Sequence, residues 1–482
     1  MRNGTVLLLA LAWPGLGAES LHGSKVAANP EVAGAIRLMD SWIRNQLAFR
    51  QLPGLSVAVV AGDEVVWAQG FGYADVAKKT PVTPATLFRM ASNSKMFTAL
   101  AILQLRDAGK LTLDDPVSKH LPWFRVKGDF EDNQPITIRH LITHTSGLPR
   151  ESASPYWSSF DFPTREQLRE RLSIQEAAYA PSVRWKYSNL ALSIAGEVVE
   201  AVSGEPYIQY IDKHLFAPLG MTASSMVPSE DDKKKLATGY ARRMPDGSRA
   251  ATPFTDCRGI TAAAGLTSNA LDMAKFMIAM MKRGKAAEGG VLRGTTLAEM
   301  QRVHWLESNW TSGWGLGFSV RKLGERTLVG HGGSLAGYKT QTAFTPADRV
   351  GVVVLTNGDE SNPVGFVNRI YADLIPAVVK ATKPAAKKPE WKPEWSAYVG
   401  RYRSNFSESE VMALDGELVV IDPSSDDPKG GMAKLVPLAD GTFRIEAASG
   451  GQSVGEKAVF LRGASGKVEK LRMGWGESKR VD

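Results

Sequence analysis

The chain has 482 residues, which is too long for one ordinary domain and enough for two or three. Its 43% hydrophobic and 22% charged residues are typical of a globular protein, and no apolar run approaches the roughly 20 residues that cross a bilayer. Apart from a local excess in the segment 380–394, the net charge of +8 is dispersed, which argues against nucleic acid as a partner. Cys257 is the only cysteine, so a disulfide within the chain and a thiolate metal cluster are excluded.

The first 18 residues have the pattern of a secretory signal peptide. Arg2 precedes the apolar run 6–13, and the small residues Gly15, Gly17 and Ala18 follow it. The pattern predicts a secreted or periplasmic protein with no membrane span after cleavage. A disordered or buried N-terminal tail is the alternative interpretation.

After a flexible lead, the spacing of apolar residues predicts strands early in the chain, helices in the middle and strands late. A helix is expected over 31–51, a β-hairpin over 55–70, and a helix from Ser92 to about Gly109. Further helices are expected at 137–144, 165–172, 190–202, 207–215 and 268–283, then strands at 327–330, 338–345 and 350–356 and a helix at 363–379. This order predicts an α/β domain over 31–378 in which both ends build one sheet around a helical insertion.

The remaining part of the chain has a different composition. Residues 379–394 are rich in Pro and Lys, which predicts a semi-rigid, solvated linker. Short strands with Gly and Asp turns are expected beyond it at 398–402, 410–414, 418–421, 442–446, 458–462 and 468–473. We therefore predict a small all-β domain over 395–482, either barrel-like or a meander.

Ser92, at the start of the helix 92–109, is the candidate nucleophile. Lys95 lies three residues later and projects from the same side of the first turn. A serine hydroxyl attacks poorly until a base takes its proton, and lysine can be that base when burial and nearby positive charge lower its pKa. The free N–H groups of a helix start, including that of Ser92, can stabilise an oxyanion. Because such a pair also arises by chance on surface helices, the interpretation depends on partners further along.

Tyr187 and Asn189 stand just before a predicted helix. Tyr187 could be a phenolate base or a proton shuttle for Ser92, with Lys95 holding its pKa below the free value of roughly 10. The amide of Asn189 has the donors and the acceptor to suit Lys95 and a substrate carbonyl. The alternative is a helix N-cap beside a core tyrosine.

His331, Gly332, Gly333 and Ser334 join the end of one predicted strand to the start of the next. Glycines there let a substrate backbone approach closely, and the N–H of Ser334 could be a second oxyanion donor. His331 could polarise Tyr187 or contact the substrate. A tight turn between strands with a packed histidine is the alternative.

Together, in this order and spacing, the three motifs resemble the serine β-lactamase and penicillin-binding protein superfamily. The closest similarity is to its branch of class C β-lactamases, D-alanyl-D-alanine carboxypeptidases, D-aminopeptidases and β-lactamase-like esterases. The segments 109–122, 136–149, 216–221, 264–268 and 330–338 are similar to recurring segments of that branch, so the resemblance covers about 31–378. It implies an α/β domain with an antiparallel sheet flanked by helices, an all-α subdomain, and an active site between them. Residues 395–482 resemble the lipocalin-like C-terminal β domain of some members.

The resemblance also implies roles. By position, the nucleophile, the lysine and the tyrosine of the family fall on Ser92, Lys95 and Tyr187. The predicted substrate-binding set is Asn189, His331, Gly332, Gly333 and Ser334. Expected substrates are small-molecule esters, amides, D-amino-acid peptides or β-lactams, and no metal or organic cofactor is expected.

One position departs from the family pattern. In true β-lactamases and carboxypeptidases the third motif usually begins with a lysine that helps to bind the substrate carboxylate, whereas this chain has His331. A neutral imidazole is a weaker anchor for an anion. The sequence therefore favours an esterase, an amidase or a D-amino-acid peptidase over an efficient β-lactamase. The rival hypothesis is a penicillin-binding-type ligand sensor or binding protein with little turnover.

Two further patterns concern the surroundings of the site. The loops 151–163 and 305–317 carry Tyr156, Trp157, Trp310 and Trp314, which suggest an apolar acyl or leaving-group site. His140 and His144 are spaced as metal ligands can be, but no Glu follows His140 in a zincin pattern, so we predict structural roles for both. The sequence does not indicate an oligomeric state.

Overall fold

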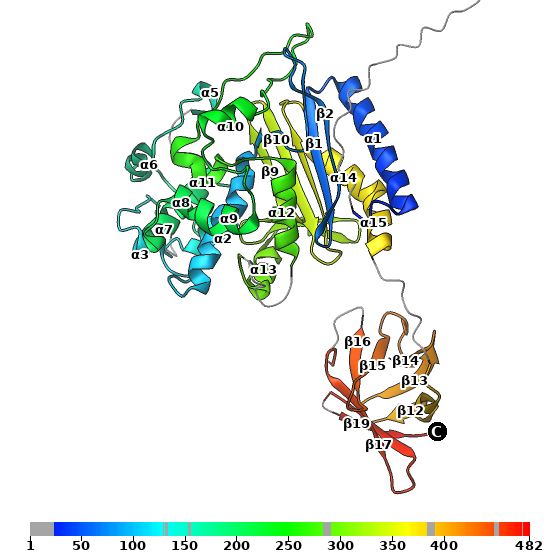
Figure 1. Ribbon diagram of the computed structural model, residues 1–482. Helices are drawn as coiled ribbons and strands as arrows, with labels where there is room; N and C mark the ends of the chain where they lie inside the picture. The colour runs from blue at the N-terminus through cyan, green and yellow to red at the C-terminus, as the bar shows by residue number, and fades with distance from the viewer. Residues whose placement is uncertain are drawn as a thin grey trace, which may run out of the picture. The chain divides into compact units, whose positions relative to one another are not determined.

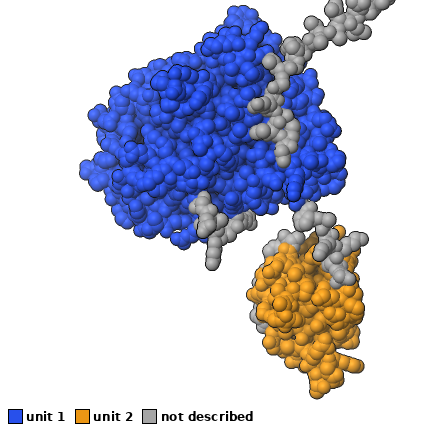
Figure 2. All heavy atoms as spheres, viewed as in Figure 1, with its two compact units in different colours: residues 1–382 blue, residues 383–482 orange. Residues whose placement is uncertain are grey.

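The computed structural model describes residues 24–128, 130, 134–152, 156–282, 291–382, 391–447, 453–474 and 476–482. The predicted signal peptide, residues 1–18, and the linker segment 383–390 lie outside these ranges. The chain divides into two compact units, residues 1–382 and 383–482 (Figure 2). Within the described ranges, no helix is both long and apolar enough to cross a membrane.

A nine-stranded sheet forms the centre of the first unit, and both ends of that unit supply its strands (Figure 1). The strand order is β3-β2-β1-β11-β10-β9-β8-β7-β6, and every pairing is antiparallel. Val57 of β1 lies opposite Val354 of β11, where the early hairpin meets the late strands. The strands are β1 (Gly54–Ala61), β2 (Glu64–Asp75), β3 (Thr80–Pro81), β6 (Trp305–Leu306), β7 (Ser312–Trp314), β8 (Ser319–Leu323), β9 (Arg326–Leu335), β10 (Tyr338–Thr345) and β11 (Val350–Thr356).

Helices cover both faces of the sheet, and this explains its most apolar strands. Every residue of β1 and β11 is buried, as expected of β-branched runs with a helix layer on each side. One face packs against α1 (Pro30–Arg50), α14 (Pro363–Asp373) and α15 (Ile375–Thr382), and α12 (Ala270–Met281) lies on the other (Figure 1). The two faces therefore enclose separate apolar cores.

The other described helices of the first unit lie on the same side of the sheet as α12 (Figure 1). Among them, α2 (Ser94–Asp107) follows a short 3₁₀ turn, η1 (Ala91–Asn93). The others are α3 (Val117–His120), α4 (Ile138–Thr143), α5 (Tyr156–Ser159), α6 (Arg165–Leu172), α7 (Asn189–Ser203), α8 (Tyr207–Ile211), η2 (Asp212–Phe216), α9 (Ala217–Leu219), α10 (Glu230–Lys235), η3 (Arg258–Ile260), α11 (Thr261–Ala264) and α13 (Gly294–Gln301), with the strand pair β4 (Phe88–Arg89) and β5 (Thr267–Ser268). The predicted fold class of an antiparallel sheet flanked by helices, with an all-α subdomain, is confirmed.

The helix after Ser92 and the last helix of the first unit differ from the prediction in their start or their continuity. The helix expected to begin at Ser92 begins at Ser94, because η1 occupies the preceding turn. The single helix expected over 363–379 is two helices, since Pro376 lacks an N–H and fits only the first turn of a new helix. That second helix, α15, ends at Thr382, inside the segment 379–394 that the composition indicated as linker.

The second unit is a closed eight-stranded barrel, which confirms the predicted all-β, barrel-like C-terminal domain. After the turn η4 (Pro393–Ala397), its strands are β12 (Gly400–Arg403), β13 (Glu408–Leu414), β14 (Glu417–Ile421), β15 (Ala433–Pro437), β16 (Phe443–Ala447), β17 (Lys457–Arg462), β18 (Val468–Met473) and β19 (Gly476–Arg480). The sequence patterns indicated neither β15 nor β19. The residues of β19 are Gly-Glu-Ser-Lys-Arg, with no apolar alternation, and pairing with β12 and β18 makes them a strand.

Candidate active site

Ser92 and Lys95 lie one turn apart where η1 leads into α2. The Nζ atom of Lys95 lies 3.0 Å from the Oγ atom of Ser92. It also donates a 2.8 Å hydrogen bond to the carbonyl of Ala263, in α11. Ala91, directly before Ser92, has a φ of 48°, a left-handed conformation that costs free energy for a residue other than glycine. The turn thus holds the serine hydroxyl beside a buried amine.

Burial determines the protonation of Lys95. The side chain is fully buried, and this burial lowers its pKa from 10.5 to about 7, with Arg150 acting in the same direction and Glu151 against it. The charged form of an amine loses its hydration in such a place, so the neutral form is favoured. Near pH 7, Lys95 is therefore neutral in a large fraction of the protein molecules, and its amine can accept a proton from Ser92.

Tyr187 completes a three-membered hydrogen-bonded group with these two residues. It precedes α7, whose first turn Ser188 caps by accepting the N–H of Ala191. The hydroxyl of Tyr187 donates to the Oγ atom of Ser92 over 2.9 Å, and the Nζ atom of Lys95 lies 4.9 Å from the centre of its ring. The prediction of a lowered tyrosine pKa is wrong, because burial raises the pKa of Tyr187 well above its usual value. Tyr187 is therefore a neutral hydroxyl and not a phenolate.

A group of aromatic rings encloses Tyr187. The ring of His144 lies 4.4 Å from that of Tyr187, and its Nδ1 atom accepts the N–H of Ser188. Trp185 and Trp314 stack on each other with ring centres 5.0 Å apart, and Trp314 also lies 5.0 Å from His144. Of these rings, the sequence indicated Trp314 as a wall of the site and His144 as structural. It gave no signal for Trp185, which approaches Trp314 only in the folded chain.

The other aromatics expected in the pocket wall are placed differently. Trp310 is 79% exposed, whereas Tyr156 is buried and donates its hydroxyl to the carboxylate of Glu151. Trp157 packs against Tyr156 and Phe162. Tyr156 therefore supports a polar group next to the site instead of forming an apolar wall.

His331 in β9 reaches the same group of rings. Its ring centre lies 6.2 Å from that of Tyr187 and 5.6 Å from that of Trp314. Burial lowers the pKa of His331 to about 3, so the imidazole is neutral at pH 7. Its Nδ1 atom lies 2.6 Å from the carbonyl oxygen of Gly332, which can only accept, so Nδ1 carries the proton. The Nε2 atom is then a buried acceptor, and it has no partner among the described residues.

The two glycines after His331 let β9 lie against other parts of the site. A Cβ atom on Gly333 would lie 2.2 Å from the carbonyl oxygen of Met90, directly before η1. A Cβ atom on Gly332 would lie 2.9 Å from Oε1 of Gln341, on the neighbouring strand. The hydroxyl of Ser334 accepts from Lys339. A side chain at position 333 would thus push the third motif away from the turn that holds Ser92.

Asn189 is the first residue of α7, and its side chain has an unpredicted partner. Its Nδ2 atom donates a 2.5 Å hydrogen bond to Oε1 of Glu151. Its Oδ1 atom is buried and has no partner within the described part of the chain. The expected contact with Lys95 is not among the hydrogen bonds of the described residues, so the structure brings Asn189 to the site through Glu151.

Glu151 and Arg150 are functional candidates that the sequence interpretation missed. The guanidinium of Arg150 lies 5.5 Å from the ring centre of Tyr187, and its side chain is 64% exposed. Both residues directly follow the segment 136–149, but they stand in a loop without periodicity, so only the fold reveals their contacts.

Among the described residues, no three His, Cys, Asp or Glu side chains meet in a way that would hold a metal ion.

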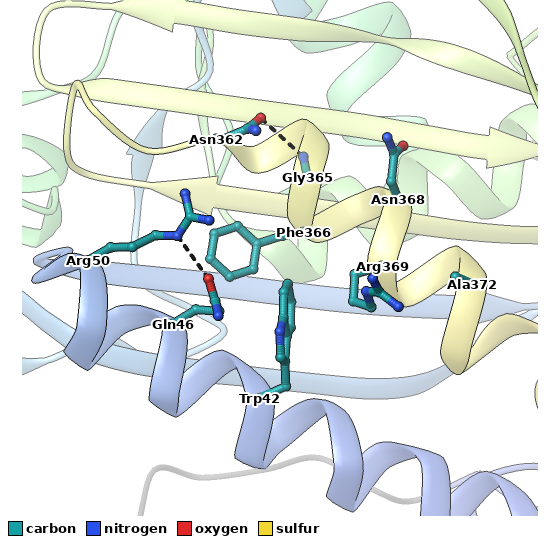
Figure 3. A pocket seen from close by; sticks show the side chains of 9 residues that line it. All are labelled: Trp42, Gln46, Arg50, Asn362, Gly365, Phe366, Asn368, Arg369 and Ala372. Atoms are coloured by element: carbon teal, nitrogen blue, oxygen red, sulfur yellow. Dashed lines mark hydrogen bonds between the residues drawn. The ribbon is translucent and has the colours of Figure 1, made fainter.

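A hollow of about 290 Å³ lies away from these residues, between α1 and α14 (Figure 3). Trp42 and Phe366 meet edge to face in it, with ring centres 5.2 Å apart. Arg50 and Arg369 also line it. None of its lining residues belongs to the group around Ser92.

The comparisons with known proteins agree with this fold. The family model described as Beta-lactamase matches residues 39–377, so the chain belongs to that family. The chain is 30% identical to the putative penicillin-binding protein PbpX of Bacillus subtilis (strain 168), over 65% of this chain and 73% of that protein. It is 33% identical to Protein flp of Staphylococcus aureus (strain MRSA252), over 42% of this chain but only 40% of that protein.

Solved structures extend the comparison. The octameric penicillin-binding protein homologue from Pyrococcus abyssi is 27% identical, with a TM-score of 0.63 over 92% of this chain and 99% of that one. A D-stereospecific amidohydrolase from Streptomyces sp. is 23% identical, with a TM-score of 0.59 over 69% of this chain and 97% of that one, and supports the fold alone. The resemblance stated from the sequence motifs is confirmed.

Proposed function

We propose that the chain is a serine hydrolase that cleaves ester or amide bonds through an acyl-enzyme on Ser92. The observation that carries the proposal is the position of the Ser92 hydroxyl, 3.0 Å from the amine of Lys95 and 2.9 Å from the hydroxyl of Tyr187. A serine beside a neutral amine has the base that a nucleophile needs. Membership of the Beta-lactamase family supports the same chemistry.

The proton path of the proposed reaction follows from the pKa values. In acylation, Oγ of Ser92 bonds to the substrate carbonyl carbon while its proton passes to the neutral amine of Lys95. When the bond to the leaving group breaks, Lys95 returns the proton to that group, with the hydroxyl of Tyr187 as the relay. In deacylation a water molecule attacks the acyl carbon and gives a proton to Lys95. The bond to Oγ of Ser92 then breaks, and Lys95 returns the proton to that oxygen.

The developing negative charge needs donors that are already in place. The backbone N–H of Ser92 precedes the 14-residue helix α2, whose N-terminal dipole favours a negative charge. We propose the N–H of Ser334, after the two glycines of β9, as the second donor. The close approach of Gly333 to Met90 supports this role, because it keeps β9 next to η1.

The protonation state of His331 limits the class of substrate that the site would bind. A lysine at this position would offer a cation to a substrate carboxylate, whereas neutral His331 offers the lone pair of Nε2. A hydrogen-bond donor, such as an amide N–H, an ammonium or a hydroxyl, suits that acceptor. We therefore propose esters, amides and D-amino-acid peptides as substrates, and expect β-lactams, which carry a carboxylate, to be hydrolysed slowly.

The test is covalent labelling followed by a substrate panel. A fluorophosphonate probe should label the wild type, and Ser92→Ala should lose labelling and about a thousandfold or more of its hydrolysis of p-nitrophenyl acetate. Ser118→Ala, at an exposed serine of α3, is the matched control and should retain both. Full activity in Ser92→Ala would refute the proposal. Labelling without turnover of p-nitrophenyl butyrate, D-alanine p-nitroanilide or nitrocefin would instead indicate a ligand sensor.

We also propose export of the chain, which the pattern of residues 1–18 supports. Expression of the full chain followed by cell fractionation and N-terminal sequencing tests it. Recovery of an intact N-terminus in the cytoplasm would contradict it.

A further inference from the structure

We infer that Glu151 is a positioning residue of this site, whose carboxylate holds the amide of Asn189 in one orientation and places a negative charge that acts on Lys95. The inference rests on the proposed function, because that function makes Lys95 the base and Asn189 a substrate-binding residue. It adds a residue that lies outside the three sequence motifs and acts through two members of them.

The carboxylate of Glu151 is fixed from several directions. Its Oε1 atom accepts from Nδ2 of Asn189 over 2.5 Å and from Nε of Arg150 over 3.3 Å, and its Oε2 atom accepts from the hydroxyl of Tyr156. Its backbone carbonyl accepts from the side chain of Gln175 over 3.0 Å. The side chain is only 16% exposed. With a donor on each oxygen, the carboxylate is built to hold its neighbours and not to bind a substrate.

This contact determines which way the Asn189 amide faces. A carboxylate accepts hydrogen bonds and cannot donate them, so the nitrogen of the amide must point toward Glu151. The carbonyl oxygen, Oδ1, then points away, and it is buried without a partner among the described residues. A buried acceptor without a donor is unusual in a folded protein. We assign this oxygen to a donor that appears during the reaction, either the ammonium of Lys95 or an N–H of the substrate.

Glu151 also has an electrostatic role in the surroundings of Lys95. Burial lowers the pKa of Lys95, and the charge of Glu151 opposes this while that of Arg150 adds to it. The titratable groups that face the Lys95 amine from the packed elements are Glu151, Arg150, Cys257, His144, His331 and Tyr187. Burial lowers the pKa of both histidines and raises that of Cys257 and of Tyr187, so these four are neutral near pH 7. The charge of Glu151 therefore stabilises the protonated amine, against the effects of burial and of Arg150.

Two substitutions separate the two effects. Glu151→Gln keeps an acceptor oxygen for Asn189 and removes the charge, so the acid limb of the labelling rate against pH should shift by about one unit to lower pH. The sign follows because the active form is the neutral amine and the lost anion had raised its pKa. Tyr156→Phe keeps the charge and the ring packing but removes one donor that holds the carboxylate. It should leave the pH midpoint unchanged and raise the KM for D-alanine p-nitroanilide about tenfold, since a less ordered Asn189 binds the amide less well.

The experiment measures fluorophosphonate labelling rates across the pH range that brackets the Lys95 midpoint, together with kcat and KM for the anilide. The matched control is Glu176→Gln, at an exposed glutamate next to Gln175, and it should behave as the wild type. Thermal unfolding of each variant checks that the fold is kept. A wild-type midpoint in Glu151→Gln, or a wild-type KM in Tyr156→Phe, would overturn the inference while leaving the proposed function intact. The proposed function itself would be refuted only if Ser92→Ala were labelled and hydrolysed substrates as the wild type does.

Discussion

The group around Ser92 and the hollow between α1 and α14 lie on opposite faces of one sheet, and both combine cations with aromatic rings. They differ in their access to water. Lys95 is fully buried and its pKa falls to about 7, whereas Arg369 is 52% exposed and pairs with Asp373 across one helical turn. Water screens such an exposed pair, so it contributes little to stability. Cationic and aromatic side chains therefore become reactive where the fold removes water from them.

Replacing the proposed base is the strongest way to break this contrast. Lys95→Met keeps the length of the buried side chain and removes the amine, so hydrolysis should fall by about a thousandfold. In the wild type the rate should rise with pH through about 7, because only the neutral amine accepts the serine proton. Steady-state rates against pH measure both effects. Lys110→Met, at an exposed lysine, is the control, and an active Lys95→Met would show that another group takes the proton.

Removing the hydroxyl of Tyr187 should have the next largest effect. Tyr187→Phe keeps the ring against His144 and Lys95 but loses the donor to Ser92, so acylation should slow by about a hundredfold. Stopped-flow release of p-nitrophenol measures this step. Tyr179→Phe, a partly buried tyrosine with no role in the proton path, serves as the control. An unchanged acylation rate in Tyr187→Phe would remove the hydroxyl from the proposed mechanism.

Gly333→Ala tests the approach of β9 to the serine turn. The added methyl would meet the carbonyl of Met90, so we expect a loss of about 1–3 kcal/mol in the free energy of unfolding together with reduced labelling of Ser92. Gly34→Ala in α1 is the control, because its Cβ would meet nothing closer than 3.9 Å and helix propensity favours alanine. Denaturant unfolding measures both variants. Equal stability of the two would contradict the close packing.

The smallest effect is expected on the other face of the sheet. Arg369→Ala removes an exposed cation from the hollow of Figure 3, so the free energy of unfolding should change by no more than about 0.5 kcal/mol and hydrolysis should be unchanged. Thermal unfolding and p-nitrophenyl acetate turnover measure these quantities. A clear loss of hydrolysis in Arg369→Ala would show that the hollow affects the reactivity of Ser92. It would contradict the difference between the two faces.

Local patterns of apolar residues predicted many of the helices and strands. The strands β10 and β11 have the bounds that their apolar runs predicted, and helix α6 likewise begins at Arg165 and ends at Leu172. The strands β15 and β19 were not predicted, because their residues lack an apolar alternation and pairing with neighbouring strands defines them. The three motifs of the candidate site were all read from the chain, while Glu151 and Trp185 were not.

The spacing of Ser92 and Lys95 in the chain already sets their relation, because one helical turn fixes the distance between residues three apart. The sequence motifs also indicated the family. The protonation states of Lys95 and Tyr187, in contrast, depend on the tertiary structure. Distant segments bury Lys95 and Tyr187 and thereby set their protonation, and they bring Glu151 to Asn189 across 38 residues of chain. Burial and long-range contact depend on the packing of the whole unit, so no local pattern of residues encodes them.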